Sequence, residues 1–205
     1  MIIGIHGYLG SMKTVTGVAL AKLAEESGYT IVSNQPLNFD YIRLDMDLLR
    51  RYTIIGEPLP YGDKVFILGD EWQQVMDARR SMDGDELINT YLVAQTRKRG
   101  IKFAYITSLR GMNDLRLRDN TNIIFKCFKR HKIGGAICYN DECDNPHYAD
   151  WYIINVAAGK GVHRTFKNPE IVYKLFDTKH IISPIAHLNE KEMQEIVKAI
   201  KVGLQ

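Results

Sequence analysis

Cysteine is scarce in this chain, and several other features that mark special classes of protein are missing. Three cysteines among 205 residues are too few for a disulfide framework and are typical of a reducing compartment. The sequence has no run of roughly 18 apolar residues, which a membrane-spanning helix needs, and no basic and apolar stretches typical of a secretion signal. We therefore expect a cytoplasmic protein without a membrane span.

A strong excess of charge of one sign is also absent. The net charge of +3 is too small to indicate nucleic-acid binding by itself, although many basic residues gather in three stretches, at 95–102, 109–119 and 126–132. Such stretches are commonly solvated faces. The alternative is a surface that contacts phosphate or a neighbouring subunit, and the sequence leaves both interpretations open.

Apolar segments alternate with helical patterns over the first 130 residues. The predicted helices span 15–27 and 86–99, and the predicted strands span 1–5, 29–33, 64–69, 103–108 and 122–127. This alternation predicts an α/β fold, with a mostly parallel sheet flanked by helices. Between 39 and 62 we predict only a helix and a turn.

The pattern changes beyond residue 130. A strand, a polar turn and a returning strand between 134 and 156 predict a β-hairpin added to the sheet. The segment 170–178 reads as one further strand. Asn189 and Glu192 form a capping box in front of apolar residues at helical spacing, which predicts a C-terminal helix.

Repeats, low-complexity segments and linkers are not found, and the length suits one domain. We therefore predict a single domain over 1–205. It consists of a core over about 1–130 and an appended hairpin and helix over about 131–205.

The segment IHGYLGSMKT, residues 5–14, matches the phosphate-binding consensus G-x-x-x-x-G-K-[ST] except where Met12 replaces the second glycine. In such a loop backbone N–H groups surround the β-phosphate, the lysine reaches the β- and γ-phosphates, and the hydroxyl binds Mg²⁺. Met12 preserves this cradle if its φ is negative, and strains it otherwise. The predicted nucleotide-contacting residues of the loop are Gly7, Tyr8, Leu9, Gly10, Ser11, Met12, Lys13 and Thr14.

An acidic pair follows the apolar strand at 64–69. We assign Asp70 to the Mg²⁺ shell, together with Thr14, and Glu71 to the polarisation of an attacking water. The alternative is that these acids only cap a following helix. Because both motifs occur in the expected order on an alternating pattern, we favour a site for ATP and Mg²⁺.

The motifs together resemble the FtsK–HerA superfamily of P-loop ATPases, nearest to viral genome-packaging ATPases and phage-assembly proteins related to the zonular occludens toxin domain. The resemblance rests on GYLGSMKT, FILGDEWQQVMDARRS, YLVAQTRKRGI and ITSLRGMNDLRLRDNTN, and extends to about residue 180. It implies a RecA-like sheet, a ring of identical subunits, and translocation of double-stranded DNA without sequence preference. Toxin-type relatives carry a membrane anchor, so we favour the packaging branch, with capsid proteins as further partners and the host cytoplasm or the virion as location.

The resemblance also implies catalytic residues. A polar sensor, commonly glutamine in that superfamily, is expected near Ser108 or Leu109. An arginine of a neighbouring subunit is expected to neutralise charge on the γ-phosphoryl group. The candidates are Arg79, Arg80, Arg97, Arg99, Arg110, Arg116 and Arg118, of which the resemblance favours Arg116 and Arg118. With these, the predicted catalytic residues are Lys13, Glu71, Ser108, Arg116 and Arg118.

A second group of residues raises the question of zinc. Cys138, Cys143 and His147, with Cys127 or His131, have the loose spacing C-x4-C-x3-H and lack paired C-x2-C elements. We interpret this segment as a polar hairpin turn with incidental cysteines and keep a metal site as the lesser alternative.

Three functions remain in competition. The leading hypothesis is an ATP-hydrolysing motor that packages viral or phage-like DNA. A small-molecule or nucleoside kinase shares the loop and the sheet, but the sequence shows no arginine-rich lid to exclude water. A non-hydrolysing assembly protein is the third, supported by Met12 alone.

Overall fold

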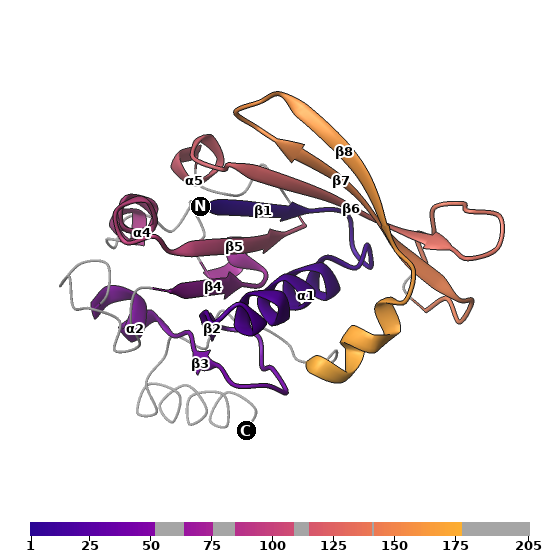
Figure 1. Ribbon diagram of the computed structural model, residues 1–205, viewed down its shortest axis with the longest axis horizontal. Helices are drawn as coiled ribbons and strands as arrows, with labels where there is room; N and C mark the ends of the chain where they lie inside the picture. The colour runs from indigo at the N-terminus through magenta and orange to yellow at the C-terminus, as the bar shows by residue number, and fades with distance from the viewer. Residues whose placement is uncertain (52–63, 76–84, 109–114, 141, 178–205) are drawn as a thin grey trace, which may run out of the picture.

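The computed structural model describes residues 1–51, 64–75, 85–108, 115–140 and 142–177 (Figure 1). These residues form an eight-stranded sheet in the order β3-β2-β4-β5-β1-β6-β7-β8. The strands are β1 Ile2–His6, β2 Thr30–Ser33, β3 Ile42–Arg43, β4 Val65–Gly69, β5 Lys102–Thr107, β6 Ile123–His131, β7 His147–Asn155 and β8 Lys160–Phe166.

The six strands from β3 to β6 run parallel to one another. Every residue of β1 and of β4 is buried, because helices cover both faces of the sheet at its centre. The carboxyl ends of β1, β2, β4 and β5 therefore meet at one edge, where ligands bind in open α/β sheets. A mostly parallel sheet flanked by helices is the predicted fold class, and this prediction is confirmed.

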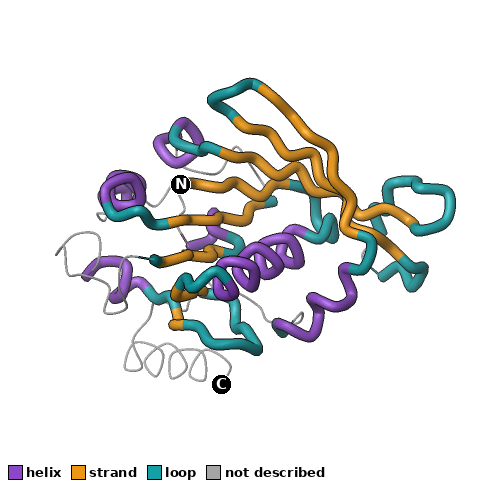
Figure 2. The backbone as a smooth tube through the Cα atoms, viewed as in Figure 1, coloured by secondary structure: helices purple, strands orange, loops and turns teal. Residues whose placement is uncertain are grey.

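Successive side chains of each strand point to opposite faces of the sheet, so the apolar core has two parts. On one face, α1 (Lys13–Glu26) packs over alternate residues such as Ile5, Leu68 and Ile106, and Figure 2 shows this helix lying across the sheet. The opposite face carries α3 (Trp72–Val75), α4 (Asp85–Lys98) and α5 (Leu115–Asp119). Their buried side chains Trp72, Leu92 and Leu117 pack in the second part of the core, with the strand residues that alternate with those under α1.

Beyond the parallel part, β6, β7 and β8 form an antiparallel extension. The hairpin predicted over 134–156 is found only in part: its first strand is reduced to an isolated bridge at Ile137, and its returning strand is the end of β7, which pairs with the nine-residue β6. Strand β8, which pairs with β7, was not predicted. Gly159, with φ of 61°, allows the tight turn between β7 and β8.

Two shorter elements differ from, or add to, the predictions. The segment 170–178 was expected as a strand, but residues Pro169–Leu175 form a 3-10 helix, η4, and only Phe176 pairs with Leu37 in an isolated bridge. Pro169 begins this helix, where a missing N–H is tolerated, and Val172 is buried. The helix expected at 39–62 corresponds to α2 (Met46–Arg50), whose first turn is capped by Asp45. Residues 52–62 lie outside the described residues, so the expected turn stays a prediction.

Some predictions lie outside the described residues. These are the C-terminal helix near 189–200 and, with it, the division into a core and an appended part, which stays a prediction. Among the helices that are described, none has the length and apolar character needed to cross a bilayer.

Candidate functional site

The predicted phosphate loop connects the end of β1 with the start of α1. The loop folds back on itself: the Ser11 N–H donates to the Tyr8 carbonyl over 3.2 Å, and Lys13 Nζ donates to the same oxygen over 2.8 Å. A Cβ on Gly7 would lie 2.7 Å from the Cys127 carbonyl oxygen, so only glycine fits where the loop passes β6. Helix α1 begins directly after this loop, and the N–H groups of a helix's first turn are the ones that can bind a phosphate.

Met12 occupies the left-handed region, with φ of 64° and ψ of 31°. The condition for an unstrained loop, a negative φ, is therefore not met, and Met12 adopts a conformation that costs a residue with a Cβ about 1–2 kcal/mol. Its side chain is buried in the core beneath α1. Burial of a methionine side chain is worth about 1.5–3 kcal/mol, which offsets the strain.

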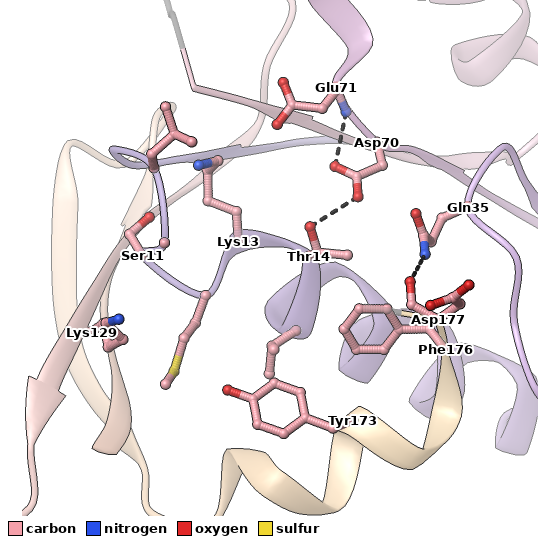
Figure 3. A pocket seen from close by; sticks show the side chains of 14 residues that line it. Ser11, Lys13, Thr14, Gln35, Asp70, Glu71, Lys129, Tyr173, Phe176 and Asp177 are labelled. Carbon is pink, nitrogen blue, oxygen red and sulfur yellow. Dashed lines mark hydrogen bonds between the residues drawn. The ribbon is translucent and has the colours of Figure 1, made fainter. Parts of the chain in front are cut away.

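Asp70 lies at the carboxyl end of β4, opposite the loop. Its Oδ2 accepts a 2.9 Å hydrogen bond from Thr14 Oγ1 and its Oδ1 accepts the Glu71 N–H over 2.8 Å (Figure 3). Asn34, just after β2, pairs with the Asp70 backbone, donating to the carbonyl over 2.8 Å and accepting the N–H over 2.7 Å. The two residues assigned to Mg²⁺ are thus adjacent, and their hard oxygen atoms suit this ion.

Burial raises the pKa of Asp70 to about 6, and the nearby charge of Glu71 also raises it, whereas the Thr14 hydrogen bond and the Lys13 ammonium lower it. The buried carboxylate is therefore less stable in its charged form than it is in water. A bound cation would relieve this cost, so a metal ion and a proton compete for Asp70.

Glu71 has a positive φ of 44°, a second strained position at this edge. Its carboxylate accepts a hydrogen bond from Gln73 of α3 and one of 3.5 Å from Ser108 Oγ. Gln73 also donates to Ser108 over 3.3 Å. Ser108, at the end of β5, therefore lies beside Glu71, and Gln73 of α3 contacts both side chains.

A cavity of about 360 Å³ lies between the loop and this acidic edge, within the range of ligand pockets. Its lining also includes residues that no sequence motif indicates: Gln35, Lys129, Tyr173, Phe176 and Asp177 (Figure 3). Gln35 Nε2 donates to the Asp177 carbonyl over 2.9 Å, which ties the segment after η4 to the end of β2.

The favoured arginines lie away from this cavity. Arg116 and Arg118 belong to α5, which precedes β6 and therefore lies at the amino edge of the parallel strands (Figure 1). Arg116 is exposed and donates to Thr90 Oγ1 over 2.9 Å. Positions 79, 80 and 110 and the side chain of position 97 lie outside the described residues, so those candidates stay untested.

The parallel sheet, the phosphate loop and the acidic strand end define a RecA-like P-loop NTPase fold. Solved structures share it. The chain is similar to the N-terminal domain of zonular occludens toxin from Neisseria meningitidis, at 16% identity and a TM-score of 0.59, covering 86% of this chain and 98% of that one.

It is also similar to the DNA-packaging ATPase of Sulfolobus turreted icosahedral virus, at 13% identity and a TM-score of 0.53, over 81% of this chain and 96% of that one. A third similar structure is the flagellar accessory protein FlaH of Methanocaldococcus jannaschii, at 14% identity and a TM-score of 0.52, over 81% of this chain and 84% of that one. No family model and no curated protein matches the sequence. The predicted resemblance is thus confirmed as a likeness of fold.

The geometry of Met12 leads to a stability test. Both Met12→Gly and Met12→Ala remove the buried side chain, but glycine also removes the left-handed strain. We expect the glycine variant to have a free energy of unfolding about 1 kcal/mol above that of the alanine variant, measured by urea denaturation. Ala19→Gly in α1 is the control and should show the usual order, with alanine the more stable by about 1 kcal/mol. An alanine variant at Met12 as stable as the glycine variant would contradict the strain.

The raised pKa of Asp70 leads to a second test. Without nucleotide or Mg²⁺, Asp70→Asn should raise the free energy of unfolding at pH 7 by roughly 1–3 kcal/mol, because the variant buries no charge. The folded state of the wild type holds its proton more tightly than the unfolded state. The extra free energy of unfolding of Asp70→Asn should therefore shrink as the pH falls through the folded-state pKa of about 6 towards the ordinary value of 3.8. Asp119→Asn, at an exposed position, should leave stability nearly unchanged, and a variant destabilised at pH 7 would refute the argument.

Proposed function

We propose that this protein is an ATPase that binds ATP and Mg²⁺ in the 360 Å³ cavity and uses hydrolysis to translocate double-stranded DNA, as in the packaging of a viral or phage-like genome. The observation that carries the proposal is the 2.9 Å hydrogen bond between Thr14 Oγ1 and Asp70 Oδ2. It brings together, from residues far apart in the sequence, the two ligands that a nucleotide-bound Mg²⁺ needs.

In the proposed hydrolysis of ATP, different residues of this chain have different roles. Lys13 and the loop N–H groups hold the β- and γ-phosphates, and Mg²⁺, when bound by Thr14 and Asp70, neutralises charge on their oxygens. Glu71 lies next to this group and orients a water for attack on the γ-phosphorus. Ser108 and Gln73 contact the Glu71 carboxylate and so fix its direction.

The position of α5 supports a ring. Arg116 and Arg118 lie at the edge of the sheet opposite the phosphate loop, so neither reaches the cavity of its own subunit. In a ring of identical subunits this edge can face the cavity of the next subunit. A trans-acting arginine at such an interface stabilises charge that develops on the γ-phosphoryl group.

The basic stretches divide between the two edges of the sheet. Residues 95–102 and 115–119 lie at the amino edge, whereas residues 126–131 follow β6 towards the carboxyl edge. Contacts with DNA phosphate from such residues carry no sequence information, which suits a motor that moves along any sequence. The solved packaging ATPase supports this assignment by its fold.

Turnover of ATP tests the proposal. We expect double-stranded DNA to stimulate hydrolysis, and Lys13→Ala to lose nucleotide binding. Glu71→Gln should keep nucleotide binding but lose turnover by about 100-fold or more, because it removes the group that activates water. Glu26→Gln, at an exposed end of α1, is the matched control. Raising salt should abolish the stimulation by DNA before it lowers basal hydrolysis.

Each alternative function has its own outcome. Nucleotide binding without hydrolysis in any condition would favour a kinase or a non-hydrolysing assembly protein, and an acceptor screen separates these two. Full function in Lys13→Ala would favour the assembly protein. Stimulation by DNA that is indifferent to salt would contradict contacts with phosphate.

Mixing Lys13→Ala with Arg116→Ala tests whether Arg116 acts at the site of a neighbouring subunit. Lys13→Ala keeps the arginines and lacks a working loop, whereas Arg116→Ala keeps the loop and lacks an exposed arginine of α5. If Arg116 acts across the interface, each variant alone should be inactive, and their mixture should recover hydrolysis at the hybrid sites. Arg118→Ala serves as the comparison, since its side chain is half-buried. A mixture no more active than its two components would exclude action in trans by Arg116.

A further inference from the structure

Four nitrogen and sulfur ligands converge at the far end of β6, outside the nucleotide cavity. His131, Cys138, Cys143 and His147 each offer one ligand atom, and these atoms all lie within 4.8 Å of one another. The chain has only three cysteines and six histidines, so two of each meeting at one point is a concentration that incidental placement does not explain. The expectation that these cysteines are incidental is therefore replaced by the lesser alternative.

Strand register explains why distant residues meet here. His131 is the direct partner of His147 across the β6–β7 pair, so both imidazoles lie on the same face of the sheet. On the other side of β6, Arg130 pairs with Ile137 in an antiparallel bridge, and the Cys138 N–H donates to the Lys129 carbonyl over 2.8 Å. Cys138 is thus opposite Lys129, two residues from His131, and shares its face.

Cys143 completes the group from the loop that joins this bridge to β7. The Cys143 N–H bonds the Asn140 carbonyl over 3.4 Å, and Asn145 Nδ2 approaches Cys143 Sγ to 3.5 Å. Amide donors of this kind stabilise a thiolate that binds a metal. The ends of this loop are held to β6 by hydrogen bonds from the Cys138 N–H to the Lys129 carbonyl and from the Lys132 N–H to the Pro146 carbonyl, each over 2.8 Å.

The group has the burial expected of a closed site. Cys138 is 4% exposed, and His131, Cys143 and His147 are partly buried. His147 Nε2 is buried and has no hydrogen-bond partner among the described residues, a cost of about 1–3 kcal/mol. The two imidazole rings lie 4.7 Å apart, tilted by 37°, and do not hydrogen-bond each other. A ligand is the missing partner for this nitrogen.

We propose that His131, Cys138, Cys143 and His147 bind one structural Zn²⁺ ion in tetrahedral geometry. Two thiolates and two imidazoles are the ligand set that zinc takes in closed structural sites, and they leave no open position for catalysis. Carboxylates, which would favour Mg²⁺ or Ca²⁺, are absent from the group. Binding releases the two thiol protons to solvent.

The site also connects to the phosphate loop. Between the ligands, Tyr139 packs its ring on Tyr8, with 4.7 Å between ring centroids, and the Asn140 carbonyl accepts a 2.5 Å hydrogen bond from Lys129 Nζ. Lys129 lines the nucleotide cavity. Zinc therefore fixes a loop that supports both the phosphate loop and a cationic side chain of the cavity.

Metal content and cobalt substitution test the proposal on the full, untagged chain purified under reducing conditions. We expect close to one zinc per chain. After replacement by Co²⁺ we expect the intense visible d–d bands of four-coordination and a thiolate-to-metal band. Cys138→Ser, Cys143→Ser and His147→Gln should each weaken Co²⁺ binding at least tenfold. Cys127→Ala removes the third cysteine, whose buried sulfur contacts Thr16, and should leave the spectrum unchanged.

A chelator should lower the melting temperature of the wild type, and the same treatment should leave Cys143→Ser unaffected. The chelator should also weaken nucleotide binding by the wild type, because the metal fixes the loop that packs Tyr139 on Tyr8 and bonds Lys129. A wild type without zinc that gives no tetrahedral Co²⁺ spectrum overturns the proposal, as does a disulfide between Cys138 and Cys143. Since the wild-type measurements need no variant to fold and no hydrolysis, this result is separate from the outcome of the ATPase assay.

Discussion

The carboxylate of Asp70 is fully buried at the edge of the sheet, and its burial constrains the elements around it. A charged group removed from water is tolerated only where hydrogen bonds and opposite charges replace its hydration. Here Thr14 of α1 and the Glu71 N–H bond the carboxylate, while Asn34 after β2 holds the Asp70 backbone. Helix α1 and strands β2 and β4 must therefore keep their places together, and that arrangement forms the nucleotide cavity.

Two strained backbone positions lie at the same edge of the sheet. Met12 and Glu71 are the non-glycine residues with positive φ in the described part of the chain, and both line the cavity. Strained backbone persists where the surrounding packing overdetermines it. The buried side chain of Met12 and the contacts of Glu71 with Ser108 and Gln73 supply that packing. The strained positions therefore lie where we propose that phosphate and water bind.

Strand β6 joins the two sites that we propose. Because alternate residues share a face, Cys127 lies under α1, Lys129 lies in the nucleotide cavity, and His131 lies in the metal group. The strand is parallel to β1 on one side and antiparallel to β7 on the other. The proposed metal site and the cavity therefore share one face of the sheet, through residues of a single strand.

The sequence by itself determined the α/β fold and most of its central elements, because apolar periodicity and glycine positions are local properties. It also predicted that Lys13 and Thr14 begin a helix and that Asp70 and Glu71 follow a buried strand, because these motifs are local in the sequence. The conformation of Met12, the 3-10 helix at 169–175 and the contribution of Gln73 depend on packing and could not be predicted. The meeting of His131 with Cys138, Cys143 and His147 was decided by tertiary structure alone. Their spacing in the sequence is loose, and it is the β6–β7 register together with the bridge between Arg130 and Ile137 that brings them near one another.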